Sequence, residues 1–345
     1  MSPLIGAAGF VLVVLLVLLR LPVAIAMGCV GYVGLTLTAG ADTSGFMLGR
    51  ATFEAVFPYS LSIVPLFIAM GVFAGQAGLS QALYGFVATL VGHLRGGLAM
   101  ATIGGCAIFG AVSGSGIATA ATMGRVALPE MRRHGYADSL ACATIAAGGT
   151  LGVIIPPSIL FVVYGLATEQ SIGKLFFAGV LPGILGVILY ALAVRWSVGR
   201  DPKAGPAGPR HGWGERLRAL LSIWRVAVLF GLVLGGLYVG WFSPTEGAAV
   251  GAFGAVALAA LTGRLTGKAL ADGIGETALT SGMIFMILIG AGIFNAFIES
   301  TGMTDALIGA VQALGWSRWS VMALLMVTYI VLGAVMDELS MILLT

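Results

Sequence analysis

Charged side chains are scarce in this sequence, and their scarcity limits the class of protein it can encode. Its 345 residues include 17 Lys and Arg and 14 Asp and Glu, so 9% are charged, compared with roughly 25% in an ordinary globular chain. With 59% hydrophobic residues, there is too little polar side chain to cover a compact surface in water, whereas a bilayer requires an apolar one. The composition therefore excludes a water-soluble protein and predicts a polytopic membrane protein.

Cysteine, histidine and catalytic motifs are also sparse. The three cysteines, Cys29, Cys106 and Cys142, lie in apolar stretches, and we interpret them as buried thiols rather than a disulfide framework or a metal site. The sequence contains no HExxH pair, GxSxG elbow or Walker loop, so it offers no candidate set of catalytic residues for these enzyme classes. The net charge of +3 is too small to indicate a nucleic-acid partner. We expect neither an enzyme nor an organic cofactor.

The apolar runs are near twenty residues long, which predicts helices rather than the alternating ten-residue strands of a membrane barrel. The fold class that follows is an all-α polytopic membrane protein. Spans are expected near residues 4–19, 23–40, 58–77, 137–168, 175–198, 219–241, 244–262 and 281–299. Segments 79–92 and 302–315 carry an apolar face between spans and are expected to lie along the membrane surface.

Two apolar segments are interrupted in their middle and predict re-entrant hairpins. Segment 97–131 is broken by Ser113-Gly-Ser-Gly116, and segment 318–345 by Asp337-Glu338. If the first segment is re-entrant and the N-terminus is outside, thirteen Lys and Arg fall inside and three, Arg50, Lys174 and Arg318, fall outside. Cytoplasmic loops hold the excess of basic residues, so this topology is the expected one.

The two halves of the chain repeat. When residues 71–83 are aligned with 295–307, Phe73, Gly78, Ala82 and Leu83 meet identical residues 224 positions later. The expected domains are a first repeat at 1–200, a cytoplasmic linker at 201–218 and a second, incomplete repeat at 219–345. Under the expected topology the repeats are inverted in the membrane, which is typical of secondary transporters; chance similarity of Gly-rich helices is the alternative.

The tip of the first hairpin is the first candidate site. A break at Ser113, Gly114 and Ser115 would expose carbonyl and hydroxyl oxygens suited to sodium, and the N-terminus of the next helix could face an anionic substrate. Close packing of two helices would explain the same small residues equally well.

A second break is expected in the following span. Gly148, Gly149 and Thr150 precede the pair Pro156-Pro157, and together these residues predict unwinding around 148–157. A purely mechanical proline kink is the alternative.

Two charged positions inside apolar segments complete the candidates. Asp337 is costly to bury without a cation; the alternative is that the segment crosses the interface there. Arg125, on the returning arm of the first hairpin, could contact substrate or extend to the membrane surface.

These motifs together resemble the large membrane subunit of tripartite ATP-independent periplasmic (TRAP) transporters. The resemblance rests on 110–116 running into 118–124, on 128–131, on 148–152 with 155–158, and on 243–247. It implies sodium-coupled uptake of a small organic acid by an elevator mechanism in the bacterial inner membrane, surrounded by lipid. It also implies a four-helix small membrane subunit and a periplasmic substrate-binding protein as partners.

The same resemblance assigns roles to the candidate residues. Ser113, Gly114, Ser115, Gly148, Gly149 and Thr150 would form one sodium site, and Asp337 would begin a second. Ser113, Ser115, Gly149, Thr150 and Arg125 would contact the substrate.

By the spacing of the first repeat, a complete second half would continue roughly 80 residues beyond Thr345, so we expect a fragment or a truncated product. The alternatives are a stand-alone carboxylate symporter, or an inactive or accessory subunit if the chain ends there.

Overall fold

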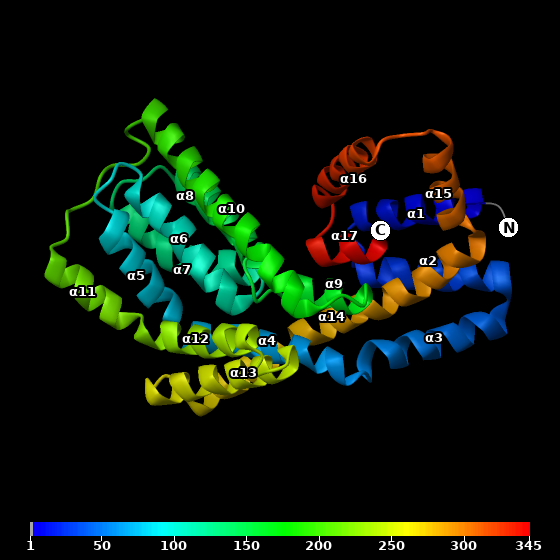
Figure 1. The fold of residues 1–345 in the computed structure, drawn as a ribbon, viewed down its shortest axis with the longest axis horizontal. Coiled ribbons are helices and arrows are strands. Elements are labelled where there is room, and N and C mark those ends of the chain that lie inside the picture. Colours follow the sequence, from blue (N-terminus) through cyan, green and yellow to red (C-terminus); the bar gives the residue numbers. More distant parts are fainter. Residues whose placement is uncertain (1–2) are drawn as a thin grey trace. The chain divides into compact units, whose positions relative to one another are not determined.

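The computed structural model describes residues 3–345, in which every regular element is a helix and none is a strand (Figure 1). The helices that begin in the first half are α1 (Pro3–Leu18), α2 (Val23–Ala39), α3 (Ala41–Val56), the 3-10 turn η1 (Tyr59–Ser62), α4 (Ile63–Gln76), α5 (Leu79–Val91), α6 (Gly97–Ser113), α7 (Gly116–Arg133), α8 (Asp138–Ile154) and α9 (Ile159–Ala167). The remaining helices are α10 (Ile172–Arg200), α11 (Trp213–Ser222), α12 (Trp224–Val239), α13 (Pro244–Leu261), α14 (Gly267–Thr301), α15 (Met303–Ala313), α16 (Arg318–Gly333) and α17 (Glu338–Leu344).

Length and apolarity make this a multi-pass membrane fold. Four helical stretches in the described chain are long and apolar enough to cross a bilayer: Tyr59–Gln76, α10, α13 and α14. Two bent pairs, α8 with α9 at 41° and α11 with α12 at 48°, raise the number to six if each pair is one span. The expected span 281–299 is the second half of the longer helix α14.

The chain divides into two compact units. Unit 1 comprises the chain up to Leu61 together with Ser281–Thr345, and unit 2 comprises Ser62–Thr280. These boundaries differ from the repeat boundaries at 200 and 219, because a repeat describes a sequence pattern and a compact unit describes contacts. The repeat assignment therefore stays a prediction.

Unit 2 is built around the hairpin of α6 and α7, which packs on itself and on α8. Both ends of this hairpin lie at the same end of the unit, because Gly96 N–H donates to the carbonyl of Gly205 and Ala137 N–H to that of Ala204. Segment 97–131 is thus a helical hairpin, as the sequence predicted, and α7 continues to Arg133. The loop that contains Ala204 and Gly205 therefore holds the two ends of the hairpin close together through hydrogen bonds.

Helix α10 continues to Arg200 and α11 begins at Trp213, so the structure has a helix in the second part of 201–218. The assignment of 201–218 as the linker between the repeats stays a prediction. Residues 41–56, for which no element was expected, form helix α3. Its sequence mixes apolar and polar residues with a helical period and contains no continuous apolar run, which is the feature on which the expected spans were based.

The unwinding expected around 148–157 is also confined to a shorter stretch. Helix α8 continues through Gly148, Gly149 and Thr150 to Ile154, and only residues 155–158 are non-helical. Ile155 is extended, with φ −83° and ψ 123°, as the residue before a proline prefers. The proline pair ends the helix, and the glycines upstream do not.

In unit 1, α2 packs against the second half of α14 through glycines. A Cβ on Gly31 would lie 2.7 Å from the Cα of Phe294, and one on Gly34 would lie 2.5 Å from the ring of Phe297. In unit 2, α13 meets α4 in a related way, with Gly251 against Met70. In both units, therefore, the second expected span of one aligned half packs against the third expected span of the other.

Local structure also recurs between the aligned segments. Gly78 and Gly302 are both left-handed, with φ of 80° and 70°, and each precedes a helix in a segment that the sequence predicted to lie along the membrane surface. Ser115 caps α7 and Asp337 caps α17. The αL conformation requires glycine at both turns, because a Cβ there is strained.

Candidate functional site

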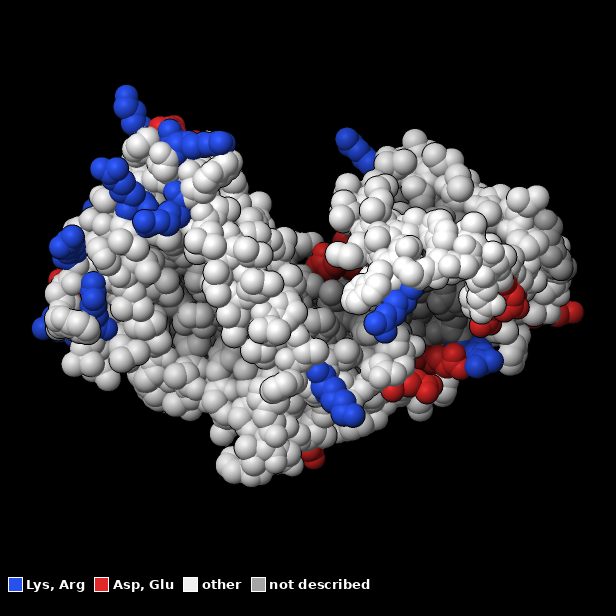
Figure 2. Space-filling model, turned by 45° about the horizontal axis from the view of Figure 1, so that its top comes forward, with Lys and Arg blue, Asp and Glu red and all other residues white. Residues whose placement is uncertain are grey.

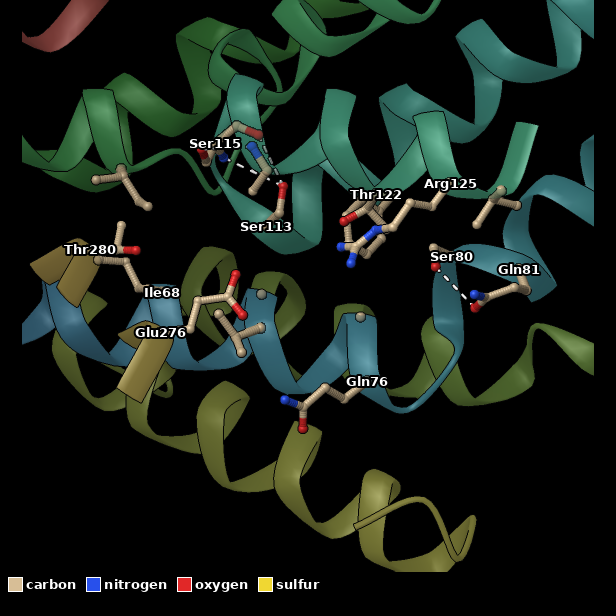
Figure 3. A pocket seen from close by; sticks show the side chains of 17 residues that line it. Ile68, Gln76, Ser80, Gln81, Ser113, Ser115, Thr122, Arg125, Glu276 and Thr280 are labelled. Atoms are coloured by element: carbon tan, nitrogen blue, oxygen red, sulfur yellow. Dashed lines mark hydrogen bonds between the residues drawn. The ribbon is translucent and has the colours of Figure 1, made fainter. Parts of the chain in front are cut away.

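A polar cavity of about 410 Å³ lies within unit 2, beside the tip of the first hairpin (Figure 3). One wall is formed by the hairpin tip and the exposed side of α7. The opposite wall is formed by α4, the start of α5 and the first half of α14. The polar or charged residues of the lining are Gln76, Ser80, Gln81, Ser113, Ser115, Thr122, Arg125, Glu276 and Thr280.

The tip itself is held by a left-handed glycine and a capping serine. Gly114 has a φ of 61°, and a Cβ there would approach the carbonyl oxygen of Pro157 to 3.1 Å, so glycine is required on both counts. Its carbonyl accepts a hydrogen bond from Ile159 N–H at 3.2 Å. The two breaks of unit 2, at 114–115 and at 155–158, are therefore fastened to each other.

Hydroxyl oxygens converge immediately behind the tip. Ser113 Oγ lies 2.7 Å from Thr119 Oγ1 and 3.3 Å from the carbonyl oxygen of Ser115. Ser158 is fully buried, and its Oγ has no hydrogen-bond partner in the described chain. Burying a hydroxyl without a partner costs free energy, so Ser158 Oγ retains unused hydrogen-bonding capacity. Hard oxygen ligands of this kind suit an alkali cation.

Arg125 is the only cationic side chain in the lining. Figure 3 shows it extending from α7 beside Thr122 into the cavity, with Glu276 projecting from α14 on the opposite wall. Arg125 forms no ion pair within 4 Å in the described chain. Its guanidinium can therefore present several N–H donors to an anionic group.

Gln76, on α4, has a side-chain oxygen that lacks a hydrogen-bond donor in the described chain. Its Oε1 is buried and without a hydrogen-bond partner, and the side chain is part of the cavity lining. An unpaired acceptor in such a position is satisfied by water or by a donor on a ligand.

The cavity continues toward the base of the hairpin. Gln81 and Val126 line both it and a second cavity of about 430 Å³, which reaches His134 and His211 beside the linker. One side of α7 therefore lines cavities along most of the length of the helix, from the tip toward the base of the hairpin. His134 and His211 are both near carboxylates, Glu130 and Glu215 respectively.

The structure brings Ser113, Ser115 and Arg125 together around one cavity, while Gly148, Gly149 and Thr150 lie elsewhere. Gly148 packs on Cys106 of α6, and a Cβ on Gly149 would lie 2.8 Å from Ala120 Cβ of α7. Thr150 is on the exposed side of α8, where its hydroxyl lies 3.0 Å from that of Tyr190. In this conformation the two glycines allow α8 to approach the hairpin closely.

Asp337 belongs to unit 1, where it begins helix α17. Its carboxylate accepts hydrogen bonds from the N–H and the hydroxyl of Ser340. The sequence predicted an unpaired acid at this position, whereas in the structure the capping hydrogen bonds from Ser340 satisfy part of the hydrogen-bonding capacity of the carboxylate. Of the three cysteines, only Cys106 is buried in the described chain, so the expectation of three buried thiols is wrong for Cys29 and Cys142.

Several lining residues were not among the sequence candidates. Gln76, Gln81 and Glu276 come from segments up to about two hundred positions apart, and no local motif connects them. The available signal was a polar residue in each apolar helix, which is costly unless it faces protein or water.

Comparison with known proteins identifies the family. The model of the family described as "Tripartite ATP-independent periplasmic transporter, DctM component" matches residues 10–345. The chain is 35% identical over 312 residues to the C4-dicarboxylate TRAP transporter large permease protein DctM of Pseudomonas aeruginosa, covering 90% of this chain and 72% of that protein. It is 34% identical to the ectoine/5-hydroxyectoine TRAP transporter large permease protein UehC of Ruegeria pomeroyi, covering 89% and 71%.

A third relative is the isethionate TRAP transporter permease protein DctMQ of Oleidesulfovibrio alaskensis, 32% identical over 337 residues. The match covers 94% of this chain but 51% of that protein, so the chain spans about half the length of this relative. All three of these relatives are named transporter permeases. The family match and the helical fold agree over nearly the whole described chain, and the protein belongs to the DctM-component family of tripartite ATP-independent periplasmic transporters.

Proposed function

We propose that this chain is the large permease of a sodium-coupled uptake system for a small organic anion in the bacterial inner membrane. The observation that carries the proposal is the cavity at the hairpin tip, where Arg125 faces a polar chamber without a carboxylate partner. An acidic group on a small substrate would complete the pairing that the described chain leaves open. Glu276 on the other wall would disfavour a second negative charge close to it.

The chemistry of the relatives' named substrates supports an anion. C4-dicarboxylates, sialic acid and ectoine carry a carboxylate, and isethionate carries a sulfonate. A guanidinium can form paired hydrogen bonds with either group. The size of the cavity, about 410 Å³, lies within the range of small-molecule sites.

Sodium would enter as a co-substrate held by oxygen ligands at the tip. Ser113 Oγ lies 2.7 Å from Thr119 Oγ1 and 3.3 Å from the carbonyl oxygen of Ser115. Ser158, whose buried Oγ has no hydrogen-bond partner in the described chain, belongs to the second break, which is bonded to the tip through Gly114 and Ile159. No group of three or more His, Cys, Asp or Glu in the described chain is arranged to hold a metal ion. Neutral oxygens favour a weakly bound alkali cation over a transition metal.

The proposed partners are a periplasmic substrate-binding protein and a small membrane subunit. Support comes from the family and from the relative named DctMQ, whose name joins the two permease components. We further propose that transport follows an elevator mechanism, in which the helices that carry the hairpin tip move together as one rigid domain. The hydrogen bond from Ile159 N–H to the Gly114 carbonyl connects the two helix breaks, which supports their moving together.

The test is uptake by proteoliposomes that contain the chain with its small membrane subunit and its binding protein. Radiolabelled succinate, ectoine, N-acetylneuraminate and isethionate are the probes, each offered with an inward sodium gradient and no ATP. One of them should accumulate with sodium and not with potassium. Accumulation that needs ATP, or that is equal in potassium, would contradict the proposal.

The sodium site has its own variant. Ser113→Ala removes an oxygen ligand and should raise the sodium concentration for half-maximal uptake several-fold, with a smaller effect on the substrate concentration. Thr168→Ala, which removes an exposed hydroxyl outside the cavity, is the matched control. An unchanged sodium dependence in Ser113→Ala would place the ion elsewhere.

A further inference from the structure

Helix α11 packs on α5, and together with the first turn of α12 it forms an amphipathic stretch whose apolar face is exposed in the described chain. The apolar residues are Trp213, Leu217, Leu220, Leu221 and Trp224. At about 100° per residue these positions fall on one side of the helix. Helix α11 buries none of its residues, and Trp213 is 83% and Leu221 62% exposed.

Arginines flank this apolar face on both sides. On the same helical projection, Arg216 lies along one edge, Arg218 and Arg225 lie along the other, and Glu215 lies opposite. The guanidinium of Arg216 is 5.4 Å from the ring centroid of Trp213, and that of Arg225 is 6.0 Å from that of Trp224. Each edge of the apolar face therefore combines an aromatic ring with a cation.

These arginines lack anionic partners within the described chain. None of the three forms an ion pair within 4 Å, and Arg216 Nε is buried without a hydrogen-bond acceptor. The one acid of α11, Glu215, is engaged by His211 at 2.9 Å and by the N–H of Gly212. The stretch 210–225 holds four arginines and one glutamate, so its net charge is positive.

The surrounding surface has the same sign. Lys and Arg gather at the left of Figure 2, over the end of unit 2 that carries α11 and the loop after α10. Arg200 in that region stacks over Trp196 with its guanidinium 3.9 Å from the ring centroid. Tryptophan and arginine together are typical of the level at which lipid headgroups lie.

We propose that α11 lies in the interfacial layer of the bilayer and binds anionic phospholipid headgroups through Arg216, Arg218 and Arg225. The apolar face enters the acyl boundary, and Trp213 and Trp224 lie at headgroup depth. The 48° bend between α11 and α12 turns the chain from the membrane surface into the following span. Anionic lipid thereby anchors the connection between the two predicted repeats.

A straight continuation of α11 into the span is less favourable. It would carry Arg216 and Arg218 toward the hydrocarbon with no carboxylate to pair them, which is costly. The bend avoids this cost because it keeps both guanidinium groups at the surface.

The test places a bimane label on Leu221→Cys in a chain whose three native cysteines are replaced by alanine, reconstituted in bilayers. The lipid is phosphatidylcholine with phosphatidylglycerol, one or the other carrying brominated acyl chains. Brominated phosphatidylglycerol should quench the label about threefold to tenfold more strongly than brominated phosphatidylcholine at equal mole fraction. The preference should fall as NaCl rises from 0.05 to 0.5 M.

The variant R216Q/R218Q/R225Q should lose the preference, while the triple Arg→Lys variant keeps most of it. The matched control, Arg50→Gln, Lys174→Gln and Arg318→Gln, removes three charges from the predicted outer side and should retain the full preference. Equal quenching by both lipids in the wild type, no quenching by either, or displacement by 10 mM inorganic phosphate would overturn the proposal. If the glutamine variant does not reach the bilayer folded, a salt-independent preference in the wild type would overturn it equally.

Discussion

Under the proposed function, recognition of the anion depends on Arg125, because it is the only cation lining the cavity at the hairpin tip. We expect Arg125→Gln to raise the substrate concentration for half-maximal uptake by roughly 10-fold to 100-fold, since a hydrogen bond between charged groups contributes about 1.5–3 kcal/mol. Arg125→Lys should recover part of the loss, because a lysine keeps the charge without the paired donors.

The matched control for Arg125 is Arg133→Gln on the same helix, where the side chain is exposed and does not line the cavity. It should leave uptake unchanged. Equal losses in both variants would mean that net charge, rather than a contact at residue 125, governs recognition. The sequence could single out Arg125 only as an isolated charge, because Gln76 and Glu276 reach the cavity from distant segments.

Substitution of Gly149 would test the close contact between α8 and the hairpin. A Cβ there would lie 2.8 Å from Ala120 Cβ and 3.1 Å from the carbonyl oxygen of Gly116, so Gly149→Ala should destabilise by about 1–3 kcal/mol through overpacking. The measurement is the midpoint of thermal unfolding of the purified protein in detergent.

Gly231 provides the comparison. It lies inside α12, and a Cβ there would meet no other atom within 4 Å, so Gly231→Ala should be neutral or raise stability by about 0.5–1 kcal/mol. If Gly149→Ala is as stable as Gly231→Ala, then α8 and α7 are not in the contact described.

At the scale of elements, the sequence predicted helix positions best where composition changes abruptly. The Ser-Gly-Ser-Gly tip and the proline pair mark the two breaks of unit 2, since each removes helix propensity within an apolar run. The extent of the second break was overestimated, because Gly148 and Gly149 looked like helix breakers but serve close packing. Helix α3 went unpredicted because its half-polar sequence has no continuous apolar run.

An ion pair between Arg132 and Asp138 at the base of the hairpin should make the stability of the protein depend on pH. Arg132 donates two hydrogen bonds to the Asp138 carboxylate, at 2.7 and 3.1 Å, and the charge-assisted pair requires the carboxylate to be ionised. Its contribution to stability is therefore present above the ordinary range of carboxylate titration, at about 3.9, and is lost as the carboxylate is protonated at lower pH.

We therefore expect Asp138→Asn to lower the unfolding midpoint at pH 7 by on the order of one or two degrees, because the pair is exposed. The difference from wild type should shrink as the pH falls below about 4. Asp42→Asn, which removes another first-turn acid with no arginine partner in the described chain, should lack this pH-dependent part. A difference that grows toward low pH would contradict the assignment.

At the scale of the whole molecule, the predicted orientation in the membrane rests on the distribution of basic residues. Thirteen Lys and Arg gather on one side only if the first hairpin enters and leaves on that side. The structure gives this a physical basis, because the two ends of the hairpin bond to the adjacent residues Gly205 and Ala204 of one loop. A hairpin that crossed the bilayer would have to separate these two bonds by the thickness of the membrane.

Single cysteines in a chain whose native cysteines are replaced by alanine should report this orientation in spheroplasts treated with a membrane-impermeant maleimide. Lys174→Cys should react in intact spheroplasts, and Lys203→Cys only after permeabilisation. Arg95→Cys and Gly135→Cys, at the two ends of the hairpin, should both behave like Lys203→Cys. If one of them instead reacts from outside, the hairpin crosses the membrane. Every later loop would then reverse, and the inverted relation of the two halves would have to be abandoned, because Pro22 and Pro244 would begin their helices on the same side.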